Sequence, residues 1–443
     1  MSTDIQPAVP GRDSGQPAAR VILKPRKALP FYGRHPWVLA GAVERVEPLT
    51  LAGEHLVDVD GQVVDLCNER GKFIARGFYN AKSRIRVRLF SWNESETLDA
   101  EFFRRRLRAA IATRRQLGYE PAREGEAPAD PPSADHRSRS ESATRLVFSE
   151  ADGLSGLVLD RYGDYLVLQP TSLAMHQRAQ MLVELLQQEL QPRGVILRGD
   201  KQTAQLEGIE LASDRHWGEL PAAPIVIREN GLAFEVDLRE GQKTGFYLDQ
   251  RENRVAAARY LRGKRVLDLF CYTGGFALNA AKLGAAEVTG VDGSKRAIAQ
   301  AQRNAELNAL PVKFEVGDGF QTLDRLAEDA QPSAQNTAQQ FDAIVLDPPK
   351  FAKSRSAVNA ALQAYHRINK TAVALLPPGG ILVTCSCSGT VSPEDFRLML
   401  SGVAQKSGRD IQILEQRGAA ADHPVAATCL ETEYLKCFIC RVS

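Results

Sequence analysis

The fold follows from one stretch, Arg265–Ile298, which reads RVLDLFCYTGGFALNAAKLGAAEVTGVDGSKRAI. The apolar run Val266–Phe270 predicts a buried strand, and Gly274-Gly275 lead from it into a segment with helical periodicity. A second apolar run ends at Asp292. A strand, a glycine turn, a helix and a second strand in this order are typical of a sheet with bound ligands at its carboxyl edge.

The same alternation continues through the C-terminal part of the chain. Further apolar runs are VKFEVGD, FDAIVLD and GILVTCS, and helical stretches such as SKRAIAQAQRNAELNAL separate them. Continuous apolar strands alternating with helices predict a parallel sheet that is buried on both faces. Residues 251–443 are therefore predicted to form a doubly wound, Rossmann-like α/β domain with a mostly parallel sheet.

The N-terminal part of the chain has a different pattern. In residues 20–96, short alternating runs such as EHLVDVDGQVVDL and RIRVRLF are separated by turn residues, which predicts a small β-barrel. Residues 97–250 are predicted to form a central α+β domain. It would contain a helix over Leu98–Leu117 and a hairpin about Gly163-Asp164.

Three segments are predicted to lie outside these domains. Residues 1–19 are polar and rich in Pro and Gly, so we expect a disordered N-terminus. Residues 119–142 contain much Pro, Ala, Ser and acid, which predicts a flexible insertion, and 328–340 reads as a second surface insertion.

Composition excludes some classes of protein. The chain has 443 residues, of which 44% are hydrophobic and 25% charged, as in a soluble protein of two or three domains. The first twenty residues lack the apolar centre of a signal peptide, and no run of about 18 apolar residues follows. We therefore expect a cytoplasmic protein with no membrane association, whose seven cysteines are reduced thiols.

Positive charge is concentrated near the N-terminus. Between residues 20 and 90 there are thirteen Lys or Arg and seven Asp or Glu. This excess predicts a surface that binds phosphates, with Lys24, Arg26 and Lys27 as candidate binding residues. An ordinary solvated face is the alternative.

The glycine turn raises the question of which nucleotide it binds. A nicotinamide dinucleotide is the first option, but the glycines do not follow the G-x-G-x-x-G order. Asp268 would repel a pyrophosphate placed at the following helix. It suits a ligand that has an ammonium and a sulfonium in place of phosphates, which predicts S-adenosylmethionine.

Carboxylates at the ends of consecutive strands supply the candidate contacts. Asp292 would bind the ribose hydroxyls, and Asp318, in VGDGF, would accept the adenine amino group. Helix and turn capping is the alternative role for both. The other candidate cofactor-binding residues of the turn are Phe270, Tyr272, Thr273, Gly274 and Gly275.

The fourth strand ends in a motif that suits a planar base. In VLDPPKF, two prolines without N–H donors form a rigid, extended turn after Asp347. The carboxylate can address the edge of a base and the aromatic ring can stack on its face, although a plain strand-ending turn is the alternative. The candidate substrate-binding residues are Pro348, Pro349, Lys350 and Phe351.

The next strand carries two cysteines in ILVTCSCSGT, Ile381–Thr390. Methylation of a pyrimidine C5 needs a thiolate that first adds to C6, and such a thiolate needs positive charge nearby. We predict that Cys387, where the strand opens, is the nucleophile, and that Cys385 fills the core. A metal site at this pair is disfavoured because no second pair lies near it at ligand spacing. Cys437 and Cys440 form a C-x-x-C, but they lie in EYLKCFICRV, which reads as a strand with alternating faces, so zinc is disfavoured there as well.

Taken together, these motifs resemble the ribosomal RNA large subunit methyltransferase I family. The matching stretches are LKPRKALPFYGRHPWVLAGAV, GQKTGFYLDQRENR, VLDLFCYTGGFALNAAKLGAAEVTGVDGS, DPPKFAKSR, SCSG, ADHPV and EYLKCFICRV. The resemblance implies a PUA-type barrel, a central domain and a methyltransferase domain that makes 5-methylcytosine in 23S ribosomal RNA. It also implies that the retained cysteine is Cys387.

The resemblance gives a role to GQKTGFYLDQR as well. It implies that Phe246, Tyr247, Asp249 and Gln250 help to close the cofactor pocket, while Gly241 and Gly245 keep the loop tight. A linker with a helix start at Asp249 is the alternative. The insertions and the longer N-terminus fall on none of the matching motifs.

The sequence thus predicts an S-adenosylmethionine-dependent RNA cytosine-C5 methyltransferase, with Cys387 and Asp347 as catalytic residues. Its partner would be 23S ribosomal RNA or a ribosome assembly intermediate. Methylation of another base atom, a non-catalytic assembly factor and a nicotinamide dehydrogenase are the alternatives. The oligomeric state is open, with a homodimer as one option.

Overall fold

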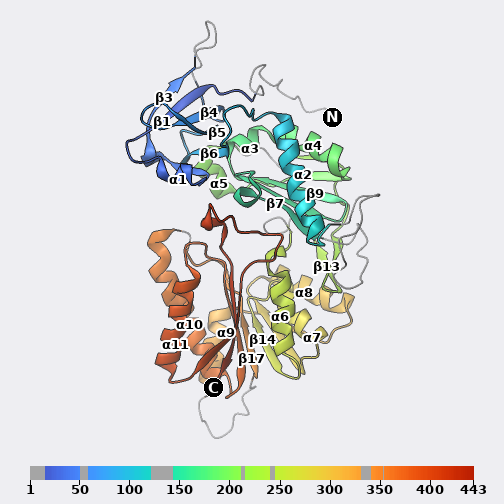
Figure 1. Cartoon of the computed structure of the whole chain (residues 1–443). Coiled ribbons are helices and arrows are strands. Elements are labelled where there is room, and N and C mark those ends of the chain that lie inside the picture. The colour runs from blue at the N-terminus through green and yellow to red at the C-terminus, as the bar shows by residue number, and fades with distance from the viewer. Residues whose placement is uncertain are drawn as a thin grey trace. The chain divides into compact units, whose positions relative to one another are not determined.

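The computed structural model describes residues 15–49, 58–120, 143–210, 215–239, 245–330, 341–352 and 354–443. Its chain divides into two compact units, which we call the N-terminal and C-terminal units (Figure 1). The N-terminal unit comprises Met1–Ala223, Leu238–Gly245 and Asp422–Leu430, and the C-terminal unit comprises Pro224–Asp237, Phe246–Ala421 and Glu431–Ser443. The predicted domain boundaries at 96/97 and 250/251 stay predictions.

The N-terminal unit begins with a curled six-stranded sheet in the order β2-β6-β5-β4-β1-β3 (Figure 1). Strand β1 pairs with β4 in parallel and with β3 antiparallel. The inner face is lined by buried apolar side chains, which include Val21, Leu66 and Val87. The elements are β1 Ala19–Leu23, α1 Leu29–Tyr32, β2 Trp37–Leu39, η1 Ala40–Ala42, β3 Val43–Pro48, β4 Val63–Cys67, β5 Phe73–Tyr79 and β6 Ile85–Ser91.

A second sheet of the N-terminal unit has the order β11-β10-β9-β8-β7. Helix α2 shares a core with both sheets, since Phe102 and Phe103 pack against Phe78 and Phe90 of the curled sheet. The predicted hairpin is confirmed, because β8 and β9 pair up to the turn at Gly163. The elements are α2 Ala100–Gln116, β7 Ala143–Phe148, η2 Ser149–Asp152, β8 Leu157–Tyr162, β9 Tyr165–Pro170, α3 Leu173–Gln177, α4 Ala179–Leu190, β10 Gly194–Leu197, α5 Lys201–Glu207 and β11 His216–Gly218.

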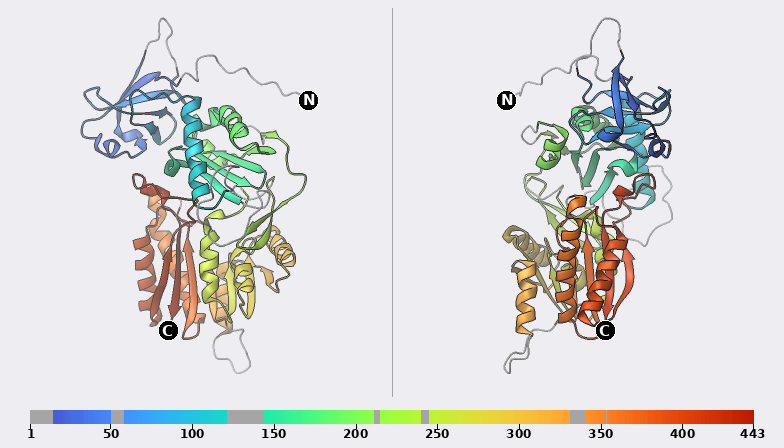
Figure 2. Two further views of the ribbon diagram at one scale, coloured as in Figure 1. Left: turned by 45° about the vertical axis from the view of Figure 1, so that its right-hand side comes forward. Right: turned by 90° about the vertical axis from the view of Figure 1, so that its left-hand side faces the viewer.

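The C-terminal unit contains a seven-stranded sheet in the order β16-β15-β14-β17-β18-β20-β19. Its neighbouring strands are parallel except at β20, which runs antiparallel to both β18 and β19. Helices cover both faces (Figure 2). The predicted α/β class, with a mostly parallel Rossmann-like sheet, is confirmed.

The elements of this sheet and its helices follow in chain order. They are η3 Leu248–Gln250, α6 Arg251–Tyr260, β14 Arg265–Leu269, α7 Gly275–Lys282, β15 Glu287–Asp292, α8 Lys295–Leu307, β16 Lys313–Val316, α9 Gly319–Asp329, β17 Ala343–Leu346, η4 Arg355–Ala357, α10 Val358–Leu375, β18 Gly380–Ser386, α11 Pro393–Ser407, β19 Ile411–Arg417, η5 Leu430–Thr432 and β20 Lys436–Val442. None of the described helices has the length and apolar character needed to cross a membrane.

Local sequence explains where several of these helices begin. The side chains of Ser294, Asp318 and Ser392 each accept a hydrogen bond from a backbone N–H in the first turn of α8, α9 and α11. Ser, Asp and Asn are the residues that favour this capping position. Each of the three helices thus starts immediately after a strand or loop at the carboxyl edge of the sheet.

Several predicted segments lie wholly or partly outside the described residues. They are 1–14 of the N-terminus, 50–57 of the barrel, 121–142 of the first insertion, 331–340 of the second and 241–244 of the GQKTGFYLDQR loop. Glu120, at the start of the predicted insertion, is buried and forms an ion pair with Arg161.

A two-stranded hairpin, β12 Ile225–Glu229 and β13 Leu232–Val236, belongs to the C-terminal unit. Two asparagine side chains bind the edge of this hairpin: Asn304 of α8 and Asn308, which directly follows the helix. The amide of Asn308 accepts from Ala233 N at 2.8 Å and donates to Ala233 O at 2.7 Å, while Asn304 Oδ1 accepts from Glu235 N at 2.8 Å. Since an isolated hairpin is marginal in water, these side chains act as a substitute for a third strand.

We expect that Asn308→Ala loosens this hairpin without unfolding the C-terminal unit. Two hydrogen bonds between the Asn308 side chain and the Ala233 backbone are lost, worth about 1–3 kcal/mol together, so amide exchange in 225–236 should accelerate about tenfold or more. Hydrogen exchange with mass spectrometry measures this effect. Gln302→Ala, on the exposed side of the same helix, is the control, and equal protection in the two variants would contradict the role of Asn308.

Candidate functional site

Most predicted site residues of the C-terminal unit lie at or just beyond the carboxyl ends of five parallel strands, β16, β15, β14, β17 and β18, and the others lie in the loop before α6. Backbone hydrogen bonds join the segments just beyond these ends. Cys271 N donates to Val291 O at 3.1 Å, Gly317 N to Asp292 O at 3.0 Å, and Asp347 N to Leu269 O at 3.4 Å. The structure therefore brings the glycine turn and the strand-end acids to one edge, as parallel pairing requires.

The glycine turn has an unusual backbone. Phe270 and Tyr272 have positive φ angles of 63° and 49°, which side chains other than glycine rarely adopt. A Cβ at Gly274, where φ is 87°, would lie 2.8 Å from the Phe314 ring, and one at Gly275 would lie 2.5 Å from Arg254 Nε. Both glycines are thus needed for close packing, and strained backbone of this kind clusters at functional sites.

Asp268 is completely buried under this turn. Its Oδ2 accepts from Ala277 N, in the first turn of α7, at 2.9 Å. Its Oδ1 has no hydrogen-bond partner among the described residues. Burial, with Asp347 and Asp292 nearby, raises the pKa of Asp268 well above its ordinary value.

The buried Oδ1 atom of Asp268 costs folding free energy as long as it accepts no hydrogen bond. A ligand that supplies N–H donors beside the strained turn would remove this cost. The buried hydroxyl of Thr273 also has no partner among the described residues. The donor-rich methionine end of S-adenosylmethionine matches this arrangement.

Asp292 and Asp318 both bind nearby backbone. Asp292 Oδ1 accepts from Ser294 N at 2.8 Å and its Oδ2 from Tyr272 N at 3.0 Å. Asp318, which is exposed, accepts from Gln321 N at 2.9 Å. Capping therefore occurs, yet each carboxylate oxygen can accept a second hydrogen bond. Their cofactor contacts stay predictions.

The loop before α6 lies against the glycine turn. The Tyr247 ring packs edge-on against Tyr272, with 5.0 Å between the ring centroids, and Phe246 is buried against Phe234. Arg254 holds this loop, since its Nη2 donates to Tyr247 O at 2.8 Å and its Nη1 to Glu229 at 2.6 Å.

The end of the same loop next to α6 binds further residues of the C-terminal unit. Tyr434 donates its hydroxyl proton to Asp249, and the Gln250 side chain accepts from Asn253 at 2.6 Å. Burial raises the pKa of Tyr247, and the nearby Tyr272, Asp347 and Cys387 add to this effect. Tyr247 thus contacts the glycine turn and interacts electrostatically with the two predicted catalytic residues.

The Asp-Pro-Pro segment borders an aromatic cluster. Asp347 and Phe351 are half-buried, Pro348 is buried, and Pro349 and Lys350 are exposed. The Phe351 ring packs against Tyr365 at 4.6 Å and against Phe320 at 5.8 Å, measured between centroids. Ser388 bonds to both neighbouring segments, because its hydroxyl accepts from Ala352 N and contacts the Tyr365 hydroxyl, each at 3.2 Å.

Among the seven cysteines, Cys387 alone is not buried. Its Sγ lies 4.0 Å from Pro348 O, beside the Asp-Pro-Pro segment. Cys385 is completely buried opposite Cys437 on β20, and burial raises its pKa well above the ordinary value. Burial also raises the pKa of Cys440 to about 12. Only Cys387 therefore combines access with a place at the carboxyl edge.

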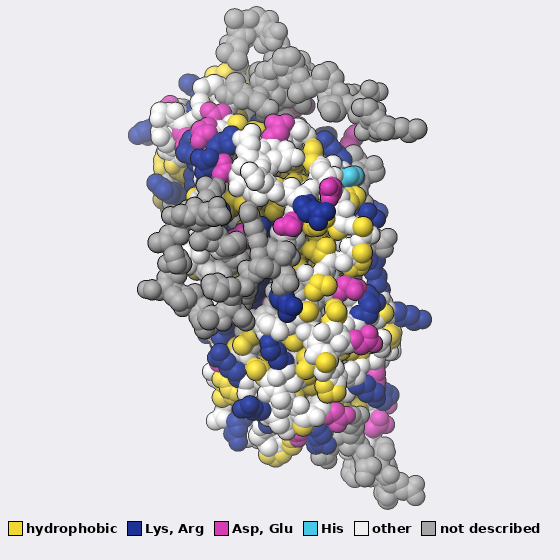
Figure 3. All heavy atoms as spheres, turned by 90° about the vertical axis from the view of Figure 1, so that its right-hand side faces the viewer, with side chains coloured by type: hydrophobic (Ala, Val, Ile, Leu, Met, Phe, Trp, Pro, Cys, Tyr) yellow, Lys and Arg dark blue, Asp and Glu magenta, His cyan; other side chains and the backbone are white. Residues whose placement is uncertain are grey.

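The candidate RNA-binding residues lie in the N-terminal unit. Lys24, Arg26 and Lys27 are exposed on the segment between β1 and α1. The basic residues of α2 are less available, since Arg104 and Arg108 both form ion pairs with Glu189. On the described surface drawn in Figure 3, Lys and Arg side chains lie among Asp and Glu side chains.

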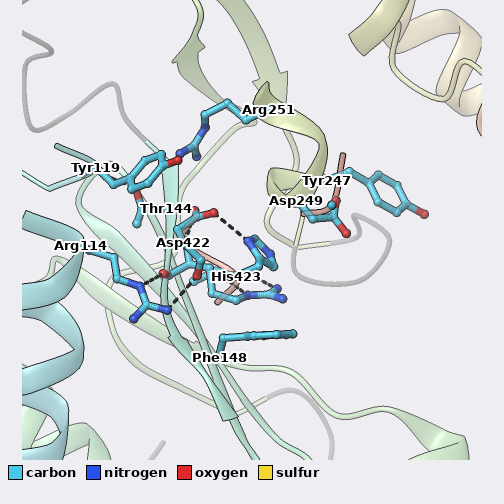
Figure 4. Close-up of polar contacts among 12 residues, drawn as sticks. Arg114, Tyr119, Thr144, Phe148, Tyr247, Asp249, Arg251, Asp422 and His423 are labelled. Atoms are coloured by element: carbon cyan, nitrogen blue, oxygen red, sulfur yellow. Dashed lines mark hydrogen bonds and ion pairs between the residues drawn. The ribbon is translucent and has the colours of Figure 1, made fainter. Parts of the chain in front are cut away.

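The ADHPV motif packs within the N-terminal unit (Figure 4). Arg114 Nη2 donates to Asp422 O at 2.8 Å, and Arg145 N donates to Asp422 Oδ2 at 3.0 Å. Asp422 Oδ1 lies 2.7 Å from His423 Nδ1, and the His423 ring lies against Phe148. The motif thus fixes a late segment of the chain to this unit.

Sequence reasoning misses residues that position these loops. Lys436, Ser388 and Tyr365 do not stand out in the sequence, because their roles depend on contacts between distant parts of the chain. The signal for Lys436 is a lysine directly before the apolar run CFIC.

Comparisons with known proteins show the class to which the chain belongs. Residues 211–429 match the family model of S-adenosylmethionine-dependent methyltransferases, and residues 21–92 match a PUA-like domain. The fold and the site define an S-adenosylmethionine-dependent methyltransferase with an N-terminal PUA-like domain. The predicted cofactor, S-adenosylmethionine, is confirmed.

The chain belongs to the ribosomal RNA large subunit methyltransferase I family. It is 38% identical over 426 residues to the family member of Klebsiella pneumoniae strain 342, which covers 96% of this chain and 98% of the relative. The member from Escherichia coli O139:H28 is 39% identical over 430 residues, covering 96% and 100%.

Solved structures agree on the fold. The crystal structure of SMU.776, described as a methyltransferase complexed with SAH, superimposes with a TM-score of 0.76 at 20% identity, covering 95% of this chain and 99% of that chain. A Streptococcus mutans structure described as a SAM-dependent methyltransferase gives a TM-score of 0.75 at 20% identity, with the same coverage.

We expect that Asp292→Ala weakens binding of S-adenosylmethionine. Hydrogen bonds from ribose hydroxyls to a charged group contribute about 1.5–3 kcal/mol, which corresponds to a rise in Kd of about 10- to 150-fold. Isothermal titration calorimetry measures this change. Asp329→Ala, at the end of α9, removes a carboxylate away from the strand ends and serves as the control; an unchanged Kd for Asp292→Ala would place the ribose contact elsewhere.

Proposed function

We propose that this protein methylates C5 of a cytosine in the RNA of the large ribosomal subunit, 23S ribosomal RNA or a ribosome assembly intermediate. The observation that carries the proposal is the accessible thiol of Cys387, beside Asp347 and Pro348 at the carboxyl edge of a methyltransferase sheet. The names of the relatives support ribosomal RNA as the substrate class.

The chemistry of cytosine explains why a thiol is needed. C5 of a pyrimidine is a poor nucleophile, so the Cys387 thiolate first forms a bond to C6. This addition makes C5 enamine-like, with Asp347 placed to bind the N3 edge of the ring. When bound, S-adenosylmethionine supplies an electrophilic methyl group. After C5 has gained the methyl, a base removes the C5 proton, and the bond between sulfur and C6 breaks to release the thiolate.

The base must leave its stack to reach Cys387. Flipping costs a few kcal/mol, least in a single-stranded or loop region, which is also where RNA sequence is readable. We propose that Pro348, Pro349, Lys350 and Phe351 border the slot that receives it. Lys24, Arg26 and Lys27 would bind the RNA backbone through phosphates.

Cys387→Ala should abolish methyl transfer to ribosomal RNA and leave binding of S-adenosylmethionine intact, because the nucleophile is lost without change to the glycine turn. Transfer of labelled methyl groups to RNA that lacks the modification, with mass mapping of the product, measures this outcome. Cys385→Ala is the matched control and should retain methylation, since that thiol is enclosed in the core.

The alternatives to C5 methylation give different results in the same assay. RNA containing 5-fluorocytosine should form a stable bond with the wild-type protein, because fluorine at C5 cannot leave as a proton does. Methylation of a guanine nitrogen or an exocyclic amine needs no thiol, so an enzyme of that kind would form no covalent complex with the 5-fluorocytosine RNA. A non-catalytic assembly factor would bind the RNA without transferring a methyl group. Full activity of Cys387→Ala would refute the covalent mechanism.

Replacing Lys24, Arg26 and Lys27 together by Ala should weaken RNA binding and lower its salt dependence. If each side chain neutralises one phosphate of a single strand, the slope of log K against log salt falls by about 2. Filter binding at several salt concentrations measures the slope. The matched control replaces three exposed basic residues of the C-terminal unit, Arg325, Lys370 and Lys406, and equal slopes for the two triple variants would exclude the proposed surface.

A further inference from the structure

One lysine of the C-terminal unit is buried where a charge is costly. Lys436, the first residue of β20, is 1% exposed and lies opposite Ser386 in the pairing of β18 with β20. A buried ammonium lowers stability unless it is paired or hydrogen-bonded. Packing alone therefore does not explain why this position holds a lysine.

The contacts of Lys436 place its charge at the end of β18. Its Nζ donates to Ser388 O at 2.7 Å and to Tyr434 O at 2.7 Å. Ser388 is the residue after Cys387, so the ammonium is fixed one residue from the proposed nucleophile. An ammonium has three N–H donors, and these two carbonyls use two of them. Among the described residues, no carboxylate lies within ion-pair distance of Lys436.

Some neighbours of Cys387 oppose a thiolate. The groups that share its electrostatic environment include Asp347, which follows β17, Tyr247 of the loop before α6 and Tyr365 of α10. A carboxylate next to a thiol disfavours ionisation of the sulfur, and two neutral phenols do not compensate for it. A neighbouring cation offsets this effect and favours the thiolate near neutral pH.

Lys436 is in the right protonation state for this role. Burial lowers the pKa of Lys436 to about 8, whereas the negative charge of Cys387 acts to raise it. The other charged groups that face it are Glu433 before β20, Asp395 of α11 and Lys350 of the Asp-Pro-Pro segment. Since the ammonium is the form present below the pKa, Lys436 carries its charge at neutral pH and loses it as the pH rises above about 8.

We propose that Lys436 is a positioning residue that activates Cys387, because its fixed ammonium stabilises the thiolate before the sulfur attacks C6 and again when the sulfur leaves. The inference rests on the proposed function, which assigns the nucleophile to Cys387. The two carbonyl contacts of Lys436 also hold the loop after β18, so the same side chain sets the place of the thiol and its charge.

The pH dependence of Cys387 alkylation by iodoacetamide tests this proposal in the full-length protein without RNA. The reaction forms a bond between sulfur and carbon and releases iodide, and peptide mass spectrometry reads it at Cys387 alone. Lys436→Met keeps most of the apolar stem but removes the charge. We expect its alkylation midpoint to move to higher pH by about one unit or more, which is about a tenfold loss of rate below the midpoint.

Matched variants separate the charge from the fold. Lys436→Arg keeps a cation and should restore most of the wild-type midpoint, and Lys370→Met, at an exposed lysine of α10, should leave it unchanged. Equal midpoints for Lys436→Met and the wild type would overturn the proposal. Should Lys436→Met fail to fold, the wild-type protein still decides: a midpoint at or above about 8.5, the ordinary value for a cysteine, overturns the proposal, and a lower midpoint supports it.

The two variants distinguish a failure of this inference from a failure of the proposed function. If Cys387→Ala abolishes methylation while Lys436→Met leaves the alkylation midpoint unchanged, only the role of Lys436 is wrong. If Cys387→Ala remains active, the covalent mechanism is wrong whatever the alkylation shows. A higher midpoint together with a lower kcat in Lys436→Met, both reversed in Lys436→Arg, supports both inferences.

Discussion

Parallel pairing of β14 with β15 on one side and β17 on the other is the constraint on which the site depends. The pairing sets Leu269 level with Val291 and Leu346, so the residues that follow each strand emerge at the same height. Hydrogen bonds beyond the strand ends extend this alignment into the loops. Asp268, Asp292 and Asp347 become neighbours for this reason, and their mutual repulsion contributes to the raised pKa of Asp268.

Strand pairing also gives different surroundings to Cys385 and Cys387, which are only two positions apart in the sequence. Strand β18 is covered up to Ser386 by its pairing with β20, so Cys385 is enclosed opposite Cys437. Cys387 directly follows the last paired residue, and its Sγ lies 4.0 Å from Pro348 O. The end of a strand thus decides which thiol is accessible to a substrate and which one belongs to the core.

Much of this arrangement can be predicted from sequence because it depends on short-range patterns. The apolar runs at Val266–Phe270 and Ile381–Ser386 indicate buried strands, and the glycine turn indicates a ligand at their carboxyl edge. The roles of Asn308 and Lys436 cannot be predicted in this way. Asn308 bonds to a residue 75 positions away and Lys436 to one 48 positions away, so only the folded chain brings the partners together. The sequence allows two roles for Asp292, ribose binding and backbone capping. In the structure its carboxylate accepts hydrogen bonds from the backbone N–H groups of Tyr272 and Ser294, so the capping role is present next to the glycine turn.

The ADHPV segment determines when, during synthesis, the N-terminal unit can complete its contacts. Arg114 and the backbone N–H of Arg145 in the N-terminal unit find acceptors on Asp422, about three hundred residues later in the chain. A growing chain therefore lacks these Asp422 contacts until translation is nearly complete. In the meantime Arg114 can form its ion pair with Asp152, whereas Arg145 N must wait for Asp422. A polypeptide that ends before Asp422 would lack both contacts, so one cut in the sequence does not separate the two units cleanly.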